Sequence, residues 1–149
     1  MSAKKVAEKT KMWSDEEKAA MRERAKEMKA EARMSKNKEE GEKVALATIA
    51  KMPEPDRTMA KKIHEIVKAN APDLMAKTWY GMPAYADADG KVVCFFKAAS
   101  KYSTRYAILG FNDGAKLDDG NMWADSYAVA KLTSAEEAKI TALVRKAVS

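Results

Sequence analysis

Histidine and cysteine, two residue types that often carry catalysis or bind metals, are scarce in this 149-residue chain. The chain holds one histidine, His64, and one cysteine, Cys94. Nucleophilic catalysis needs a nucleophile beside a base, and these two residues are expected on distant elements. A zinc site needs several thiol or imidazole ligands, and one residue of each type does not supply them. The sequence also lacks a phosphate-binding loop and a dinucleotide fingerprint. We therefore predict no catalytic residues and no cofactor, with His64 in a structural role and Cys94 buried and inert.

The residues best suited to ligand binding lie in and near the run Lys77-Thr-Trp-Tyr-Gly-Met-Pro-Ala-Tyr85. Gly81 permits backbone angles barred to other residues and Pro83 has no backbone donor, so this step should bend the chain or end strand pairing. We expect an aromatic groove for a small molecule or a protein partner. Its expected lining residues are Trp79, Tyr80, Met82, Tyr85 and Trp123. Whether these side chains line a pocket or only fill a core stays open at this point.

Two basic residues, Lys97 and Arg105, could add charge to this groove. The alternation in residues 102–109 predicts a strand with Arg105 on one face, where it could cluster with Lys97 and Lys101 at a hairpin. Beside the aromatic side chains, such a cluster would suit an anionic or aromatic ligand. The alternative is that these are ordinary solvated charges that protect a strand edge from aggregation.

The net charge of +6 is concentrated at the N-terminus. Residues 1–38 hold 12 Lys and Arg against 7 Asp and Glu, whereas residues 39–149 hold 16 against 15. A near-neutral body attracts phosphate weakly, so a nucleic-acid contact, if there is one, should be made through residues 1–38.

The sequence pattern divides the chain into four parts. Residues 1–13 lack an apolar period and should form a disordered basic tail. Ser14-Asp-Glu-Glu17 is a capping box that should begin a charged helical extension over residues 14–34. The polar residues 35–41 are expected to be a linker. Residues 42–149 should form one compact domain, as a monomer or a weak dimer.

The pattern of this domain predicts an α+β fold, in which helices pack on a small antiparallel sheet. One helix should end before Pro53, and a second, with a regular apolar stripe, should end at Asn70. The run Lys91-Val-Val-Cys-Phe-Phe-Lys97 is apolar on consecutive residues between its two lysines, which is typical of a central strand. Further strands are expected at 102–109 and 127–132, followed by a helix that begins at the capping box Thr133-Ser-Ala-Glu136.

The order of several motifs resembles the YdhG-like domain, a large bacterial family of unknown function. These motifs are Met52-Pro-Glu-Pro55, Ile63-His64, the run 77–85, Val92-Val-Cys-Phe-Phe96 and Tyr106-Ala-Ile-Leu-Gly-Phe111. The resemblance covers about residues 42–148 and implies a small α+β domain. Some members of the family are described as iron chaperones likened to frataxin.

The resemblance therefore implies iron as an alternative ligand. An iron chaperone uses clustered carboxylates, which are hard ligands that release the metal readily. The available carboxylates are Asp113, Asp118, Asp119 and Asp125, with Asp87 and Asp89 as further members. They are scattered along the sequence of a nearly neutral body.

Neither a membrane span nor a secretory signal is visible in the sequence. No apolar run approaches the roughly 18 residues of a spanning helix, and the charged N-terminus leads into no apolar core of a signal peptide. We expect a cytoplasmic protein without a membrane partner.

Overall fold

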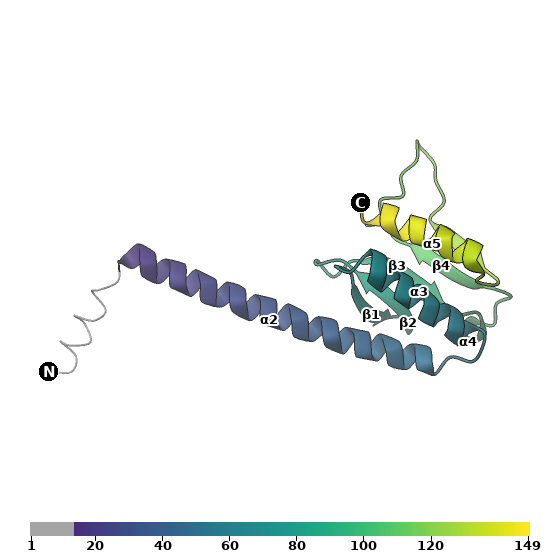
Figure 1. Ribbon diagram of the computed structural model, residues 1–149, viewed down its shortest axis with the longest axis horizontal. Helices are drawn as coiled ribbons and strands as arrows, with labels where there is room; N and C mark the ends of the chain where they lie inside the picture. Colours follow the sequence, from purple (N-terminus) through teal and green to yellow (C-terminus); the bar gives the residue numbers. More distant parts are fainter. Residues whose placement is uncertain (1–13) are drawn as a thin grey trace. The chain divides into compact units, whose positions relative to one another are not determined.

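The computed structural model describes residues 14–149, without the side chains of residues 27 and 30–36. It divides into two units, one up to Asn37 and one from Lys38 to Ser149. The tail expected at residues 1–13 lies outside the described residues. Figure 1 gives the element labels that are used below.

The first unit carries the N-terminal part of helix α2, which spans Asp15–Ala50. The Ser14 hydroxyl accepts a hydrogen bond from the backbone N–H of Glu17 at 3.1 Å, so the predicted helix start is confirmed. Three acidic residues follow in the first turn, where their negative charge interacts favourably with the positive end of the helix dipole. The side chains of Met21 and Met28 are 48% and 56% exposed. The nucleic-acid contact through residues 1–38 stays a prediction.

The linker expected at residues 35–41 is helical, because α2 continues to Ala50 without interruption. Lysine and glutamate are good helix formers, and polarity alone does not break a helix. Gly41 is the weakest helix former in this segment, and its role is close packing. A Cβ atom there would lie 2.3 Å from the carbonyl oxygen of Ala76. The compact unit therefore begins at Lys38, four residues before the expected boundary.

The two other long helices follow the predicted apolar stripes. Helix α3 spans Asp56–Asn70 and buries Met59, Ile63, Ile66 and Val67. Helix α5 spans Ser134–Ala147 and buries Ile140, Val144 and Ala147. The two helices pack against each other, and Figure 1 shows them together over one face of the sheet. Burial of both stripes against the sheet forms the core.

The sheet has five antiparallel strands in the order of the sequence. They are β1 (Met75–Trp79), β2 (Met82–Ala86), β3 (Val92–Lys97), β4 (Ala107–Phe111) and β5 (Ser126–Val129). The predicted α+β class and the central position of the strand expected within residues 91–97 are confirmed. Among the described residues, no helix combines the length and the apolar character needed to cross a membrane.

The prediction of a strand at residues 102–109 is wrong for residues 102–106. Residues Ala99–Tyr102 form the short helix α4, and Ser103 ends it with a φ of 53°. Strand β4 begins only at Ala107. A left-handed residue such as Ser103 reverses the chain direction, which an alternating side-chain pattern does not reveal.

Candidate ligand-binding site

The site begins at the tight turn between β1 and β2. Tyr80 and Gly81 have φ angles of 51° and 75°, and Trp79 pairs with Met82 on either side of them. Two consecutive residues with positive φ make the two-residue hairpin turn that matches the twist of the strands. The chain therefore turns at Tyr80-Gly81, one residue before the predicted Gly-Met-Pro step, and Pro83 lies inside β2.

Pro83 ends the pairing between β2 and β3. The register of these strands places Ala84 opposite Phe95, so Pro83 would next stand opposite Phe96. This pair is absent from the register, and proline has no N–H to donate to a neighbouring strand. The predicted loss of pairing is confirmed on this side of β2, whereas pairing with β1 continues through Thr78.

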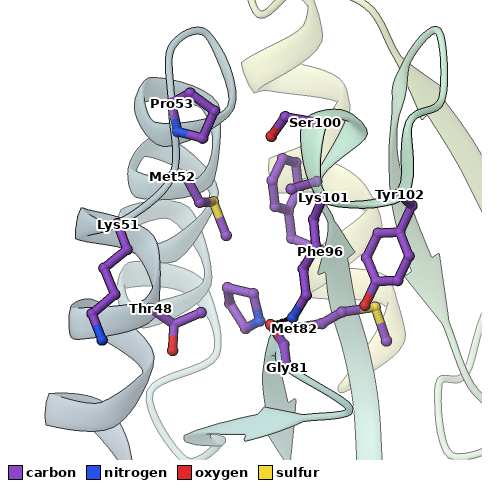
Figure 2. A pocket seen from close by; sticks show the side chains of 12 residues that line it. Thr48, Lys51, Met52, Pro53, Gly81, Met82, Phe96, Ser100, Lys101 and Tyr102 are labelled. Carbon is purple, nitrogen blue, oxygen red and sulfur yellow. Dashed lines mark hydrogen bonds between the residues drawn. The ribbon is translucent and has the colours of Figure 1, made fainter.

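A cavity of about 400 Å³ lies where the pairing stops. We call it the hairpin cavity (Figure 2). Four parts of the second unit form it: the end of α2 with the loop after it, the hairpin tip, the end of β3, and α4. Its lining residues are Thr48, Lys51, Met52, Pro53, Gly81, Met82, Pro83, Phe96, Ala98, Ser100, Lys101 and Tyr102.

The inner wall of the hairpin cavity is apolar. Met82, Pro83 and Phe96 are buried, and Phe96 is among the largest fully buried side chains of the described residues. In Figure 2 the side chain of Met52 extends from the opposite wall toward the cavity. Aromatic and thioether groups of this kind accept the apolar part of a small ligand.

Lys101 supplies positive charge at one end of the hairpin cavity. Its Nζ donates a hydrogen bond to the Gly81 carbonyl oxygen at 3.1 Å, drawn as a dashed line in Figure 2. An ammonium group has three donors, so two remain for a ligand. The neighbouring Tyr102 hydroxyl donates to the carbonyl oxygen of Tyr80 at 3.1 Å. None of the twelve lining residues is acidic.

A buried carboxylate fixes the helix that carries Lys101. Asp56, at the start of α3, is 3% exposed and accepts hydrogen bonds from the backbone N–H and the hydroxyl of Ser100. The distance from the N–H to the carboxylate oxygen is 2.9 Å. These two bonds tie α4 to α3 and thereby hold one wall of the hairpin cavity.

The residues predicted to form an aromatic groove do not line one common cavity. Of these five residues, only Met82 reaches the hairpin cavity. Trp79 is half-buried beside Lys77 and Lys91 in another cavity, and Tyr80 is 80% exposed at the tip of the turn. Trp79 and Tyr80 contact each other edge to face, with ring centroids 5.0 Å apart.

The other two expected groove residues lie elsewhere again. Tyr85 is buried under α3, and Trp123, 42% exposed, lies in the loop before β5. The physical reason is the alternation of side chains along a strand, since the register places Trp79 and Tyr85 on opposite faces of the sheet.

The predicted basic cluster forms in part. The Nζ atoms of Lys97 and Lys101 lie 4.9 Å and 5.8 Å from the ring centroid of Tyr102. Arg105 does not join them, because its guanidinium lies over the ring of Tyr106 at 5.2 Å. Lys97 and Arg105 are outside the hairpin cavity.

The aspartates of the iron alternative come together only partly. Asp113, Asp118 and Asp125 line a polar cavity of about 290 Å³ beside Trp123, without Asp119. Within residues 14–149 as described, no three His, Cys, Asp or Glu side chains are placed to hold a metal ion. The geometry of these residues therefore gives no support to iron binding.

The structure supplies partners for His64 that the sequence did not indicate. The imidazole is buried between the hydroxyl of Tyr85 and the carboxylate of Glu42. Glu42 lies on α2, 22 residues away, so no local pattern links the two. Cys94 is buried as predicted, and burial raises the pKa of its thiol to about 12.

Comparison with known proteins gives no relative for this chain. No family model matches it, and neither a curated protein nor a solved structure does. The YdhG-like resemblance stays a prediction from sequence motifs.

Proposed function

We propose that this protein binds a small organic acid in the hairpin cavity. The observation that carries the proposal is the pairing of an apolar wall with the ammonium group of Lys101, in a cavity that no acidic residue lines. A ligand with an apolar body and a carboxylate would complement both features.

The size of the cavity limits the ligand. About 400 Å³ is near the lower end of the range for small-molecule sites, which suits a compound with one or two rings. The carboxylate would accept hydrogen bonds from Lys101, and charge-assisted bonds of this kind are about twice as strong as neutral ones. The ring would pack on Phe96, Pro83 and Met52.

Binding fits the site better than catalysis does. The lining residues include no histidine, cysteine or carboxylate that could act as a general base. Lys101 and Tyr102 each donate a hydrogen bond to a backbone carbonyl of the hairpin turn. A wall held in this way is organised before the ligand arrives, which favours affinity.

The test compares ligands that differ only in charge. Phenylacetate and indole-3-acetate should raise the melting temperature and bind in calorimetry, whereas the neutral phenylacetamide should bind about tenfold more weakly. Lys101→Met should reduce the affinity for phenylacetate about tenfold or more. Lys61→Met, at an exposed position of α3, is the matched control and should bind as the wild type does. Equal binding of the acid and the amide, or an unchanged affinity in Lys101→Met, would refute the proposal.

A further inference from the structure

A second cavity, of about 220 Å³, lies against the buried histidine. We call it the His64 cavity, and it shares no lining residue with the hairpin cavity. Its apolar wall consists of Val67, Pro72, Leu74 and Ala76. His64 and Tyr85, which are 5% and 3% exposed, form its polar end together with Glu42.

The polar end is a chain of three groups. The Tyr85 hydroxyl oxygen lies 2.9 Å from His64 Nδ1, and His64 Nε2 lies 3.2 Å from Glu42 Oε1. Hydrogen bonds from Lys68 and then from His64 hold the pKa of Glu42 below its ordinary value. Glu42 is therefore an ionised acceptor at neutral pH, and His64 Nε2 must carry the hydrogen that it accepts.

The protonation of His64 then decides what the Tyr85 hydroxyl does. In the neutral imidazole Nδ1 has no hydrogen, so it accepts a hydrogen bond from the Tyr85 hydroxyl. That O–H is then not available to a ligand. In the imidazolium Nδ1 becomes a donor to the phenol oxygen, which frees the O–H of Tyr85 for another acceptor. The His64 cavity is the space beside that hydroxyl.

The other charged and titratable groups around His64 do not change this pattern of hydrogen bonds. Burial raises the pKa of Tyr85 and the pKa of Cys94, so the phenol and the neighbouring thiol stay neutral. Lys68 donates to Glu42, and Lys38 Nζ donates to the Pro72 carbonyl oxygen at 2.6 Å. Both lysines line the cavity, so Glu42 is the single acid among two permanent cations.

We propose that the His64 cavity binds a short aliphatic carboxylate, and that binding is coupled to protonation of His64. The carboxylate would accept the freed O–H of Tyr85 and lie near Lys38 and Lys68, while its alkyl chain would pack on Val67 and Leu74. A short alkyl chain fits the volume of about 220 Å³. The charge of the imidazolium adds to the attraction.

Because His64 is the only histidine, its imidazole proton resonances report this coupling without any substitution. The probe is butyrate, with butyramide as the uncharged control, added during an NMR titration between pH 5 and pH 8. By linkage, a ligand that prefers the imidazolium moves the midpoint of the His64 titration to higher pH. We expect this shift with butyrate and not with butyramide. In calorimetry, butyrate should bind about fivefold or more tightly at pH 5.5 than at pH 8.

Tyr85→Phe removes only the hydroxyl and should weaken butyrate binding at pH 5.5 about tenfold. Lys61→Met should leave that binding unchanged. An unchanged His64 midpoint at saturating butyrate, or amide shifts confined to the hairpin cavity, would overturn the proposal. If Tyr85→Phe does not fold, the titration of the wild-type protein still decides between these outcomes.

Discussion

Lys101 and Gly81 meet across 20 residues of sequence, with the lysine ammonium 3.1 Å from the glycine carbonyl oxygen. The glycine serves this contact in two ways. Its φ of 75° forms the hairpin turn, and its missing side chain leaves room for Lys101, whose Nζ would lie 2.0 Å from a Cβ there. This contact joins α4 to the hairpin and places a positive charge at the end of the hairpin cavity.

The turn residue Tyr80 should be replaceable with a gain in stability. It holds a φ of 51° with a side chain that is 80% exposed, and asparagine tolerates left-handed backbone better than tyrosine does. Tyr80→Asn should raise the free energy of unfolding by about 0.5–1 kcal/mol in urea denaturation. Tyr106→Asn, at a position without positive φ, is the control and should give no such gain. A loss of stability in Tyr80→Asn would show that the exposed ring contributes more than its backbone strain costs.

The buried carboxylate of Asp56 should be important for the stability of the protein. Asp56→Ala leaves the N–H and the hydroxyl of Ser100 without this acceptor and should lower the free energy of unfolding by roughly 2–3 kcal/mol. Ser100→Ala keeps the N–H bond and should cost only about 1 kcal/mol. Calorimetric denaturation measures both. Equal losses in the two variants would contradict the role assigned to the backbone bond.

Gly110 on β4 makes room for an aromatic ring. A Cβ atom at this position would lie 2.2 Å from the Phe95 ring, which stands opposite it on β3. Gly110→Ala should therefore destabilise the protein by roughly 1–3 kcal/mol through overpacking. The double variant with Phe95→Leu should lose less than the sum of the two single losses. Strictly additive losses would mean that the ring does not depend on the glycine.

The thiol of Cys94 should be unreactive in the folded protein. It is buried on β3, and burial holds its pKa at about 12, so little thiolate forms at pH 8. A thiol reagent should label Cys94 only as the protein unfolds, with full labelling in denaturant. Rapid labelling under native conditions would contradict this burial.

The helical stripes and the central strand could be predicted because they are local patterns. Residues such as Ile63 and Val67 repeat at helical spacing, and residues 92–96 are apolar on consecutive positions. The continuation of α2 through residues 35–41 could not be predicted, because lysine and glutamate occur both in helices and in solvated linkers. The close approach of Gly41 to the Ala76 carbonyl oxygen joins residues far apart in the sequence, so no local pattern indicates it.

The candidate site was largely out of reach for the same reason. The hairpin cavity combines four segments, and Met82 is the only one of the five expected groove residues that lines it. Lys101 lies on the short helix α4, which ends at Ser103. The alternating pattern of residues 102–109 predicts a strand there and gives no sign of this helix. The His64 chain likewise depends on Glu42, on a different helix.

The most direct test of ligand binding in the hairpin cavity uses the methyl groups of methionine. Met52 and Met82 line this cavity, whereas Met122 of the same unit is 89% exposed and lies outside it. In protein labelled with ¹³C at these methyl groups, phenylacetate should shift the resonances of Met52 and Met82 saturably and leave that of Met122 in place. The shifts should require about tenfold more ligand in Lys101→Met. Unmoved Met52 and Met82 resonances at saturating phenylacetate, or an unchanged titration in that variant, would contradict the account.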